Sequence, residues 1–206
     1  MIYKRKTGSL WWASSVMAML FAACGIFSPE TIIIEEPPMI LPPFTSPENV
    51  FENLDYAMNY KDIELYEDLL DENYRFLSPS QTDTLDIDWA KTIDVTLVGR
   101  AFDYFDKIEY ELLGTGAHWI EYGSDIAPED AVEISDKHPD ENWEVFRRPV
   151  TMYLLDDTGT VGFFVQVDFE FKMRKQKDSI TGEPILDTET GAQIWKIVLW
   201  TEYTGG

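Results

Sequence analysis

An alternation of apolar and polar side chains between residues 161 and 174 constrains this chain more than any other feature. The apolar positions are Val161, Phe163, Val165, Val167, Phe169, Phe171 and Met173, and the polar residues between them include Gln166, Asp168, Glu170, Lys172 and Arg174. A period of two predicts a β-strand with one buried face and one solvated face. The chain must therefore build a sheet, and that sheet must have a covered side.

Further strands are predicted on both sides of this segment. Residues 107–113 alternate in the same way, and Gly114-Thr115-Gly116 predicts a hairpin turn. The returning strand would place His118, Ile120 and Tyr122 on the interior face. Strands are also expected over residues 145–155 and 194–203. On a regular last strand, Trp195 and Trp200 would face opposite ways, which would leave one tryptophan on the outer face of the sheet.

Helical signals precede the strands. Ser46 suits the N-cap of a first helix, Pro47 suits its first position, and apolar residues then recur with helical spacing to about residue 60. Asp62 can cap a second, short helix, and residues 74–77 form a short strand. A third helix is predicted from about residue 86 to 104, with Trp89, Ile93, Leu97 and Phe105 as its apolar positions. Helices followed by antiparallel strands indicate an α+β fold with the helices on one side of the sheet.

The first 23 residues have the pattern of a secretory signal. A basic start, residues 4–6, precedes an apolar run over residues 10–23, which is shorter than the roughly 20 apolar residues of a spanning helix. The run ends Leu-Phe-Ala-Ala-Cys-Gly, which resembles the lipobox of bacterial lipoproteins. This resemblance implies cleavage before Cys24 and a lipid on that residue, which would attach the protein to a membrane of the cell envelope. Because Gly25 is not Asp, the outer membrane is favoured in a bacterium with two membranes. An uncleaved amino-terminal anchor is the alternative.

The region after Cys24 differs in composition from the rest. Residues 24–45 are rich in proline, which favours an extended tether, and residues 46–206 suffice for one domain with a core. Over the whole chain, 38 acidic residues face 16 Lys and Arg, and the net charge is −22. Such a surface repels phosphate backbones, so nucleic-acid binding is not expected.

The order of helix, helix, short strand, helix and long strands resembles the nuclear transport factor 2-like superfamily, also called the ketosteroid isomerase-like or cystatin-like cone. The segments that carry the resemblance are residues 46–54, 59–76 and 195–200. In this superfamily a curved antiparallel sheet wraps around the amino-terminal helices and encloses an apolar pocket. Members are enzymes, ligand binders or dimerising modules, so the resemblance implies the fold without choosing among these functions.

Candidate site residues follow from the resemblance. Isomerases of the superfamily use an Asp base with Tyr and protonated Asp as oxyanion donors, and the corresponding candidates by placement are Tyr56, Tyr60 and Asp168. Asp168 shares a face with polar neighbours and should point to solvent, so we predict no catalytic residue. Tyr56, Phe76 and His118 are instead expected to line a pocket.

Metal and cofactor sites are not predicted. Cys24 is the only cysteine, and the two histidines, His118 and His138, lack metal-ligand spacing. The acidic residues between 121 and 144 could bind calcium, but they lack the glycine-centred EF-hand pattern, and a solvated loop is the preferred interpretation. The chain contains no phosphate-binding glycine motif and no nucleophile elbow.

Three functions stay open at this point. The leading one is a non-catalytic envelope lipoprotein whose domain binds a small apolar ligand or a protein partner. The second is a small isomerase or dehydratase that uses the pocket of the cone. The third is an assembly module that acts through the outer sheet face, for instance as a homodimer.

Overall fold

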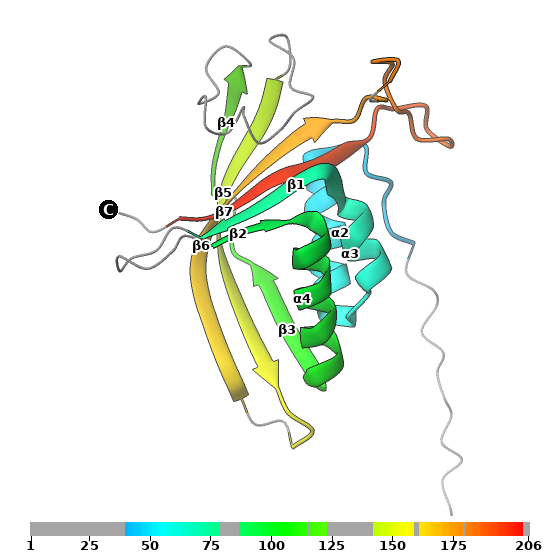
Figure 1. Ribbon diagram of the computed structural model, residues 1–206. Helices are drawn as coiled ribbons and strands as arrows, with labels where there is room; N and C mark the ends of the chain where they lie inside the picture. The colour runs from blue at the N-terminus through cyan, green and yellow to red at the C-terminus, as the bar shows by residue number, and fades with distance from the viewer. Residues whose placement is uncertain are drawn as a thin grey trace, which may run out of the picture. The chain divides into compact units, whose positions relative to one another are not determined.

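The computed structural model describes residues 40–78, 87–114, 116–122, 142–158, 161–178 and 180–203, which form one α+β domain (Figure 1). The predicted signal sequence, Cys24, His138 and most of the predicted tether lie outside these residues. Within the described ranges, no helix has both the length and the apolar character needed to cross a membrane. The expected fold class, helices packed against a curved sheet, is confirmed.

The first two helices begin at their predicted caps, and the first ends where predicted. α2 (Pro47–Tyr60) is capped by Ser46, whose hydroxyl oxygen accepts a hydrogen bond from the backbone N–H of Asn49 at 3.2 Å. α3 (Ile63–Leu69) is capped in the same way by Asp62. Capping side chains satisfy backbone donors that the first helical turn leaves unpaired, so they fix where each helix starts. The buried face of α2 contains Val50, Phe51, Leu54, Ala57 and Met58.

The predicted third helix is divided into a strand and a shorter helix. β2 (Ile87–Ala90) pairs antiparallel with β1 (Leu70–Ser78), and α4 (Lys91–Tyr104) begins only after it. Trp89 therefore lies on a strand, where it stacks on Phe76 with ring centroids 5.4 Å apart. Pairing with a distant strand has overridden the helical spacing, which is a local signal.

The apolar face predicted for this helix was also wrong. α4 buries Asp94 and Phe102, whereas Ile93 is 50% exposed. The predicted stripe started from Trp89 and was therefore out of phase with the helix that forms. The shift places a carboxyl group, and not an aliphatic side chain, on the inner side of α4.

The strands form a single sheet in the order β2-β1-β7-β6-β5-β3, and β4 also pairs with β5. The remaining strands are β3 (Lys107–Leu112), β4 (Ala117–Tyr122), β5 (Asn142–Leu155), β6 (Val161–Lys175) and β7 (Trp195–Tyr203). Every neighbouring pair is antiparallel except β1 and β7, which are parallel. The three helices lie on the concave side of the sheet (Figure 1).

The hairpin predicted at residues 114–116 does not form. β3 and β4 do not pair with each other, because each pairs with a different part of β5 along the same edge. Leu113 donates its backbone N–H to the carbonyl oxygen of Pro149 at 2.9 Å, and Pro149 has no N–H to return. Gly114 and Gly116 have φ of 64° and 56°. These positive angles, which glycine adopts readily, allow the chain to connect β3 to β4 along the edge of β5. A Cβ on Gly116 would lie 1.9 Å from a carbonyl oxygen of β5.

The main core fills the space between the concave face and the helices. The ring of Phe51 on α2 meets the rings of Phe146 on β5 and Phe171 on β6 edge-on, each with centroids 5.2 Å apart. Such edge-to-face contacts place the positive edge of one ring against the negative face of another. They attach the first helix to the two longest strands.

The expectation that Trp195 and Trp200 face opposite sides of the sheet is wrong. On β7, Ile197 and Leu199 pair with adjacent residues of β6, which leaves Val198 as an extra residue between them. A bulge of this kind reverses the alternation beyond it, so both tryptophans belong to the main core. The exposed tryptophan was the sequence argument for self-association, and a homodimer stays a prediction without that support.

Candidate functional site

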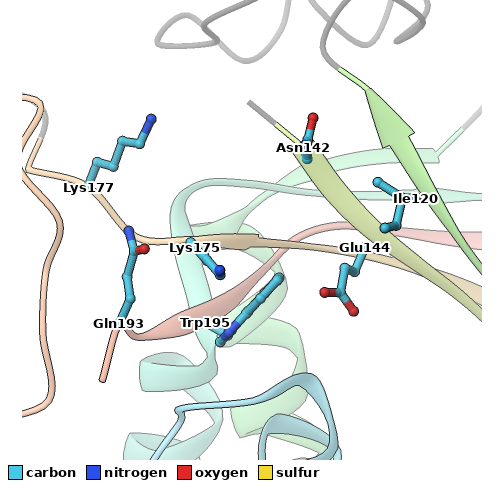
Figure 2. Close-up of a pocket in the computed structure, with 7 residues that line it drawn as sticks. All are labelled: Ile120, Asn142, Glu144, Lys175, Lys177, Gln193 and Trp195. Atoms are coloured by element: carbon cyan, nitrogen blue, oxygen red, sulfur yellow. The ribbon is translucent and has the colours of Figure 1, made fainter. Parts of the chain in front are cut away.

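A pocket of about 260 Å³ lies on the concave face at one end of the sheet (Figure 2). We call it the end pocket, and its lining residues are Ile120, Asn142, Glu144, Lys175, Lys177, Gln193 and Trp195. They come from the strands β4, β5, β6 and β7 and from both ends of the chain segment that joins β6 to β7. Ligand pockets for drug-sized molecules span about 300–1,000 Å³, so this one suits a smaller molecule.

The alternation that builds the core also places these residues. Glu144 stands two residues before the buried Phe146, and Lys175 stands two residues after the buried Met173. Positions two apart on a strand share a face. The concave face therefore continues beyond the apolar core, with charged side chains at the positions that aliphatic and aromatic residues occupy nearer the helices.

Trp195 forms the apolar floor of the end pocket. Its backbone N–H donates to the carbonyl oxygen of Phe44 at 2.7 Å, which fixes the start of β7. Its side chain is only 8% exposed, and the ammonium of Lys175 lies 5.2 Å from the ring centroid. A cation at this distance is attracted to the face of the indole, so the tryptophan orients the lysine.

Glu144 forms the opposite wall and is held by a neighbour. One of its carboxylate oxygens lies 3.2 Å from Nε2 of His118. The imidazole stacks on Phe146 with centroids 4.3 Å apart and an interplanar angle of 5°. His118 thus limits the rotation of the Glu144 side chain, which is itself 26% exposed.

A buried ion pair on the other side of β6 fixes the strand that carries Lys175. Asp71 on β1 accepts hydrogen bonds from Nε and Nη2 of Arg174, each at 2.8 Å, and another from the amide of Gln176. Burial alone would raise the pKa of Asp71, but the hydrogen bonds and charge of Arg174 lower it below its usual value. Because Arg174 and Gln176 point to one face, Lys175 between them points to the other.

The segment between β6 and β7 forms the third wall and is built from two similar turns. Asp178 accepts hydrogen bonds from the backbone N–H and the hydroxyl of Thr181, and Asp187 accepts the same pair from Thr190. These hydrogen bonds lower the pKa of both carboxyl groups. The amide of Gln193 donates to the carbonyl oxygen of residue 176 at 2.8 Å, which ties the returning segment to the outgoing one.

The side chains of the end pocket are suited to binding a small polar ligand. The lining contains two ammonium groups, two carboxamides, one carboxylate, an indole and an aliphatic side chain. A few placed polar and charged groups beside an apolar surface are what a binding pocket needs to orient a small ligand. The two lysines are notable in a chain with a net charge of −22.

The three residues predicted to line a pocket occupy different surroundings, and none of them lines the end pocket. Tyr56 stacks on Tyr60 along α2, with centroids 4.3 Å apart. Phe76 lies among core aromatics beside Trp89. His118 supports Glu144, so it contacts the end pocket indirectly. Asp168 is exposed, as its position on the strand predicts.

A second polar cluster lies inside the core, and the sequence did not reveal it. Tyr66 on α3 donates its hydroxyl to a carboxylate oxygen of Asp94 on α4 at 2.6 Å, and Tyr74 on β1 lies close to both groups. All three residues are at most 4% exposed. Burial raises the pKa of Asp94, although the hydrogen bond from Tyr66 opposes the shift. Burial also raises the pKa of the Tyr66 hydroxyl well above its usual value.

A shallower groove of about 290 Å³ lies between α2 and the sheet, lined by Glu48, Phe51, Glu52, Asp55, Leu112 and Arg148. The guanidinium of Arg148 lies 4.1 Å from the centroid of Phe51, and burial lowers its pKa. The groove therefore has acidic residues of α2 on one side and a single cation, Arg148, which already contacts the ring of Phe51. Nowhere in the described part of the chain do three His, Cys, Asp or Glu residues converge as a metal site would require.

Comparisons with known proteins concern the fold. No protein-family model and no curated protein matches the chain. Among solved structures, a nuclear transport factor 2-like protein of unknown function in nutrient uptake from Rhodospirillum rubrum has a TM-score of 0.45 and 17% identity, covering 76% of this chain and 96% of that one. A similar protein of unknown function from Pseudomonas putida has a TM-score of 0.44 and 10% identity, covering 77% and 83%.

A conserved protein from Planctomyces limnophilus has a TM-score of 0.42 and 13% identity, covering 75% of this chain and 89% of that one. The likeness in all three concerns the mixed α+β architecture with its curved, unclosed sheet.

Proposed function

We propose that the chain is an envelope lipoprotein, attached to a membrane through a lipid on Cys24, whose α+β domain binds a small molecule without transforming it. The observation that carries the binding role is the lining of the end pocket, which combines charged and amide groups with an indole floor. Pockets of this kind fix the orientation of a ligand through a few placed polar groups. The observation that supports the anchor is the signal-like sequence before the single cysteine.

Binding is tested with the full chain in detergent micelles. A set of small fragments, divided into acids, amines, zwitterions and neutral apolar molecules, is screened by NMR for shifts of the Trp195 indole and the Asn142 amide. We expect at least one class to shift both signals. If no fragment of any class does so, the domain has a different role.

The anchor is tested by mass spectrometry of the native protein. We expect the peptide before Cys24 to be absent and the mass of a diacylglyceryl group and an additional acyl chain to be present. The Cys24→Ser variant should lose this mass and leave the membrane fraction. A full-length amino terminus without added mass would reject the lipid on Cys24 and favour the uncleaved amino-terminal anchor, and binding at the end pocket would be unaffected.

The interior cluster supports the second candidate, an isomerase-like or dehydratase-like enzyme. A carboxyl group with a raised pKa beside a tyrosine can donate hydrogen bonds to a developing oxyanion. Tyr66 and Asp94, however, belong to the packed core, and neither lines the end pocket or the groove beside α2. Loss of a detected activity in the Tyr66→Phe variant, with the end pocket unaltered, would favour the enzyme over the binding protein.

A further inference from the structure

We infer that the end pocket takes a small zwitterion, a molecule of amino-acid or dipeptide size that carries both a carboxylate and an ammonium group. The inference rests on the proposed binding function and specifies its chemical class. Two walls of opposite charge carry it. Lys175 and Lys177 line the pocket from the end of β6 and just beyond it, and Glu144 lines it from β5.

The lysine wall is suited to a carboxylate. Within the described ranges, no carboxylate lies at ion-pair distance from Lys175 or Lys177. The nearest fixed partner of Lys175 is the face of Trp195, 5.2 Å from Nζ to the ring centroid. A cation–π contact leaves the hydrogen-bond donors of the ammonium available. Charge-assisted hydrogen bonds to a ligand carboxylate would use them.

The glutamate wall is suited to an ammonium group. His118 engages only one carboxylate oxygen of Glu144, Oε2, so Oε1 can accept a hydrogen bond from a ligand. In the view of Figure 2, the ends of the Glu144 and Lys175 side chains lie on either side of Trp195. A ligand with only a carboxylate would leave the charge of Glu144 without a partner. A ligand with only an amine would leave the lysines without one. A zwitterion satisfies both walls.

Three further lining residues, Gln193, Ile120 and Trp195, restrict which ligands fit the end pocket. One N–H of Gln193 Nε2 donates to the carbonyl oxygen of residue 176, so Oε1 can accept from a ligand N–H and the second N–H of Nε2 can donate to a ligand oxygen. Ile120, 46% exposed, offers an apolar contact at the rim. A sugar is a poorer fit, because carbohydrate stacking needs an open aromatic face and Trp195 is 8% exposed beneath Lys175.

The volume of about 260 Å³ sets the size limit. It falls below the range of about 300–1,000 Å³ that drug-sized ligands occupy. A free amino acid or a dipeptide of small residues fits this limit, and a longer peptide would extend into solvent.

The first experiment compares matched probes. Each of the twenty standard L-amino acids, alanylalanine and glycylleucine is titrated into the full chain in detergent micelles, with the Trp195 indole signal as readout. The tightest binder is then compared with its deaminated and decarboxylated counterparts; for leucine these are 4-methylpentanoate and 3-methylbutylamine. We expect the zwitterion to bind about tenfold or more tightly than either counterpart, since each counterpart lacks one charge-assisted hydrogen bond.

The second experiment changes one wall at a time. Glu144→Gln should weaken the zwitterion about tenfold and leave the deaminated acid unchanged or better bound. Lys175→Met should weaken the zwitterion and the acid together. Glu109→Gln and Lys107→Met, which alter an exposed ion pair on β3 away from the pocket, are the matched controls and should change nothing.

Three results would overturn the inference. The first is equal affinity for the zwitterion and its deaminated counterpart, the second is an equal loss for both ligands in Glu144→Gln, and the third is no binding of any zwitterionic probe. Binding of acids alone at the Trp195 signal would reject the zwitterion and leave the proposed binding function intact. Only the absence of binding across every fragment class would reject both.

Discussion

The concave face of the sheet has two parts with opposite character, although the same strands build both. Beneath the helices, Phe146 and Phe171 are at most 3% exposed and pack against α2. Beyond the helices, Glu144 and Lys175 occupy positions with the same orientation on the same two strands. The difference lies in the cover. Where the helices cover the concave face, its side chains are buried in the core. Where the helices end, the next side chains on that face line the end pocket.

The carboxyl groups of the two parts show the same contrast. Asp94, on the inner side of α4, is buried with a tyrosine of α3 as its hydrogen-bond partner, and burial raises its pKa. Glu144 faces the open end pocket with His118 beside it. A buried carboxyl group with neutral partners mainly joins elements of the core, whereas a partly exposed one with a fixed orientation is available to a ligand.

The largest expected difference between the two parts is in stability. Phe171→Ala should lower the free energy of unfolding by about 3–5 kcal/mol, because it removes a fully buried ring and leaves a cavity. Lys175→Ala, four residues along the same strand and on the same face, should cost about 0.5 kcal/mol or less. Urea denaturation of both variants measures the contrast. Similar losses would mean that the end pocket is part of the core.

A smaller contrast is expected between the two hydrogen-bonded carboxyl groups. Tyr66→Phe should cost about 1–3 kcal/mol, since Asp94 would lose its closest donor while still buried. His118→Phe keeps a ring to stack on Phe146 and should cost about 0.5 kcal/mol or less. The same denaturation experiment distinguishes them, and a loss of 2 kcal/mol or more, about a factor of 30 in the unfolding constant, in His118→Phe would show that Glu144 is structurally important.

Much of the fold could be predicted because its signals are local. The caps of α2 and α3 and the alternation of β6 depend on residues close in sequence. The errors depend on partners far away. β2 replaced the first turn of a predicted helix because β1 pairs with it, and Val198 bulges because of its register against β6. Neither partner is visible within a window of neighbouring residues.

The end pocket was missed for a related reason. The alternation read from residue 161 ends at Met173, and its next inward position is Lys175. The period of two therefore predicts an inward orientation for this lysine, and Trp195 lies on a predicted strand. What the sequence could not supply is where the helices stop covering the sheet. The place where the helices end determines whether Glu144 and Lys175 are buried in the core or line a pocket.

The smallest expected effect is the contribution of the buried Asp94 to the pH dependence of the free energy of unfolding. The pKa of Asp94 is raised in the folded protein, whereas an unfolded Asp has a pKa of about 3.9. Between these two pKa values the folded state holds a proton that the unfolded state has lost, so this group lowers stability as pH rises through that window. Asp94→Asn keeps an oxygen to accept the Tyr66 hydroxyl and removes the titration.

The variant should therefore gain stability relative to the parent chain as pH rises from about 4, by on the order of 1 kcal/mol, the size of one hydrogen bond. Asp71, whose pKa is lowered, contributes stability that is lost as pH falls, but it is present in both proteins and cancels from the difference. Urea denaturation at a series of pH values measures the quantity. A difference that is flat with pH would show that Asp94 titrates normally, and the helix layer would then not seal this part of the face.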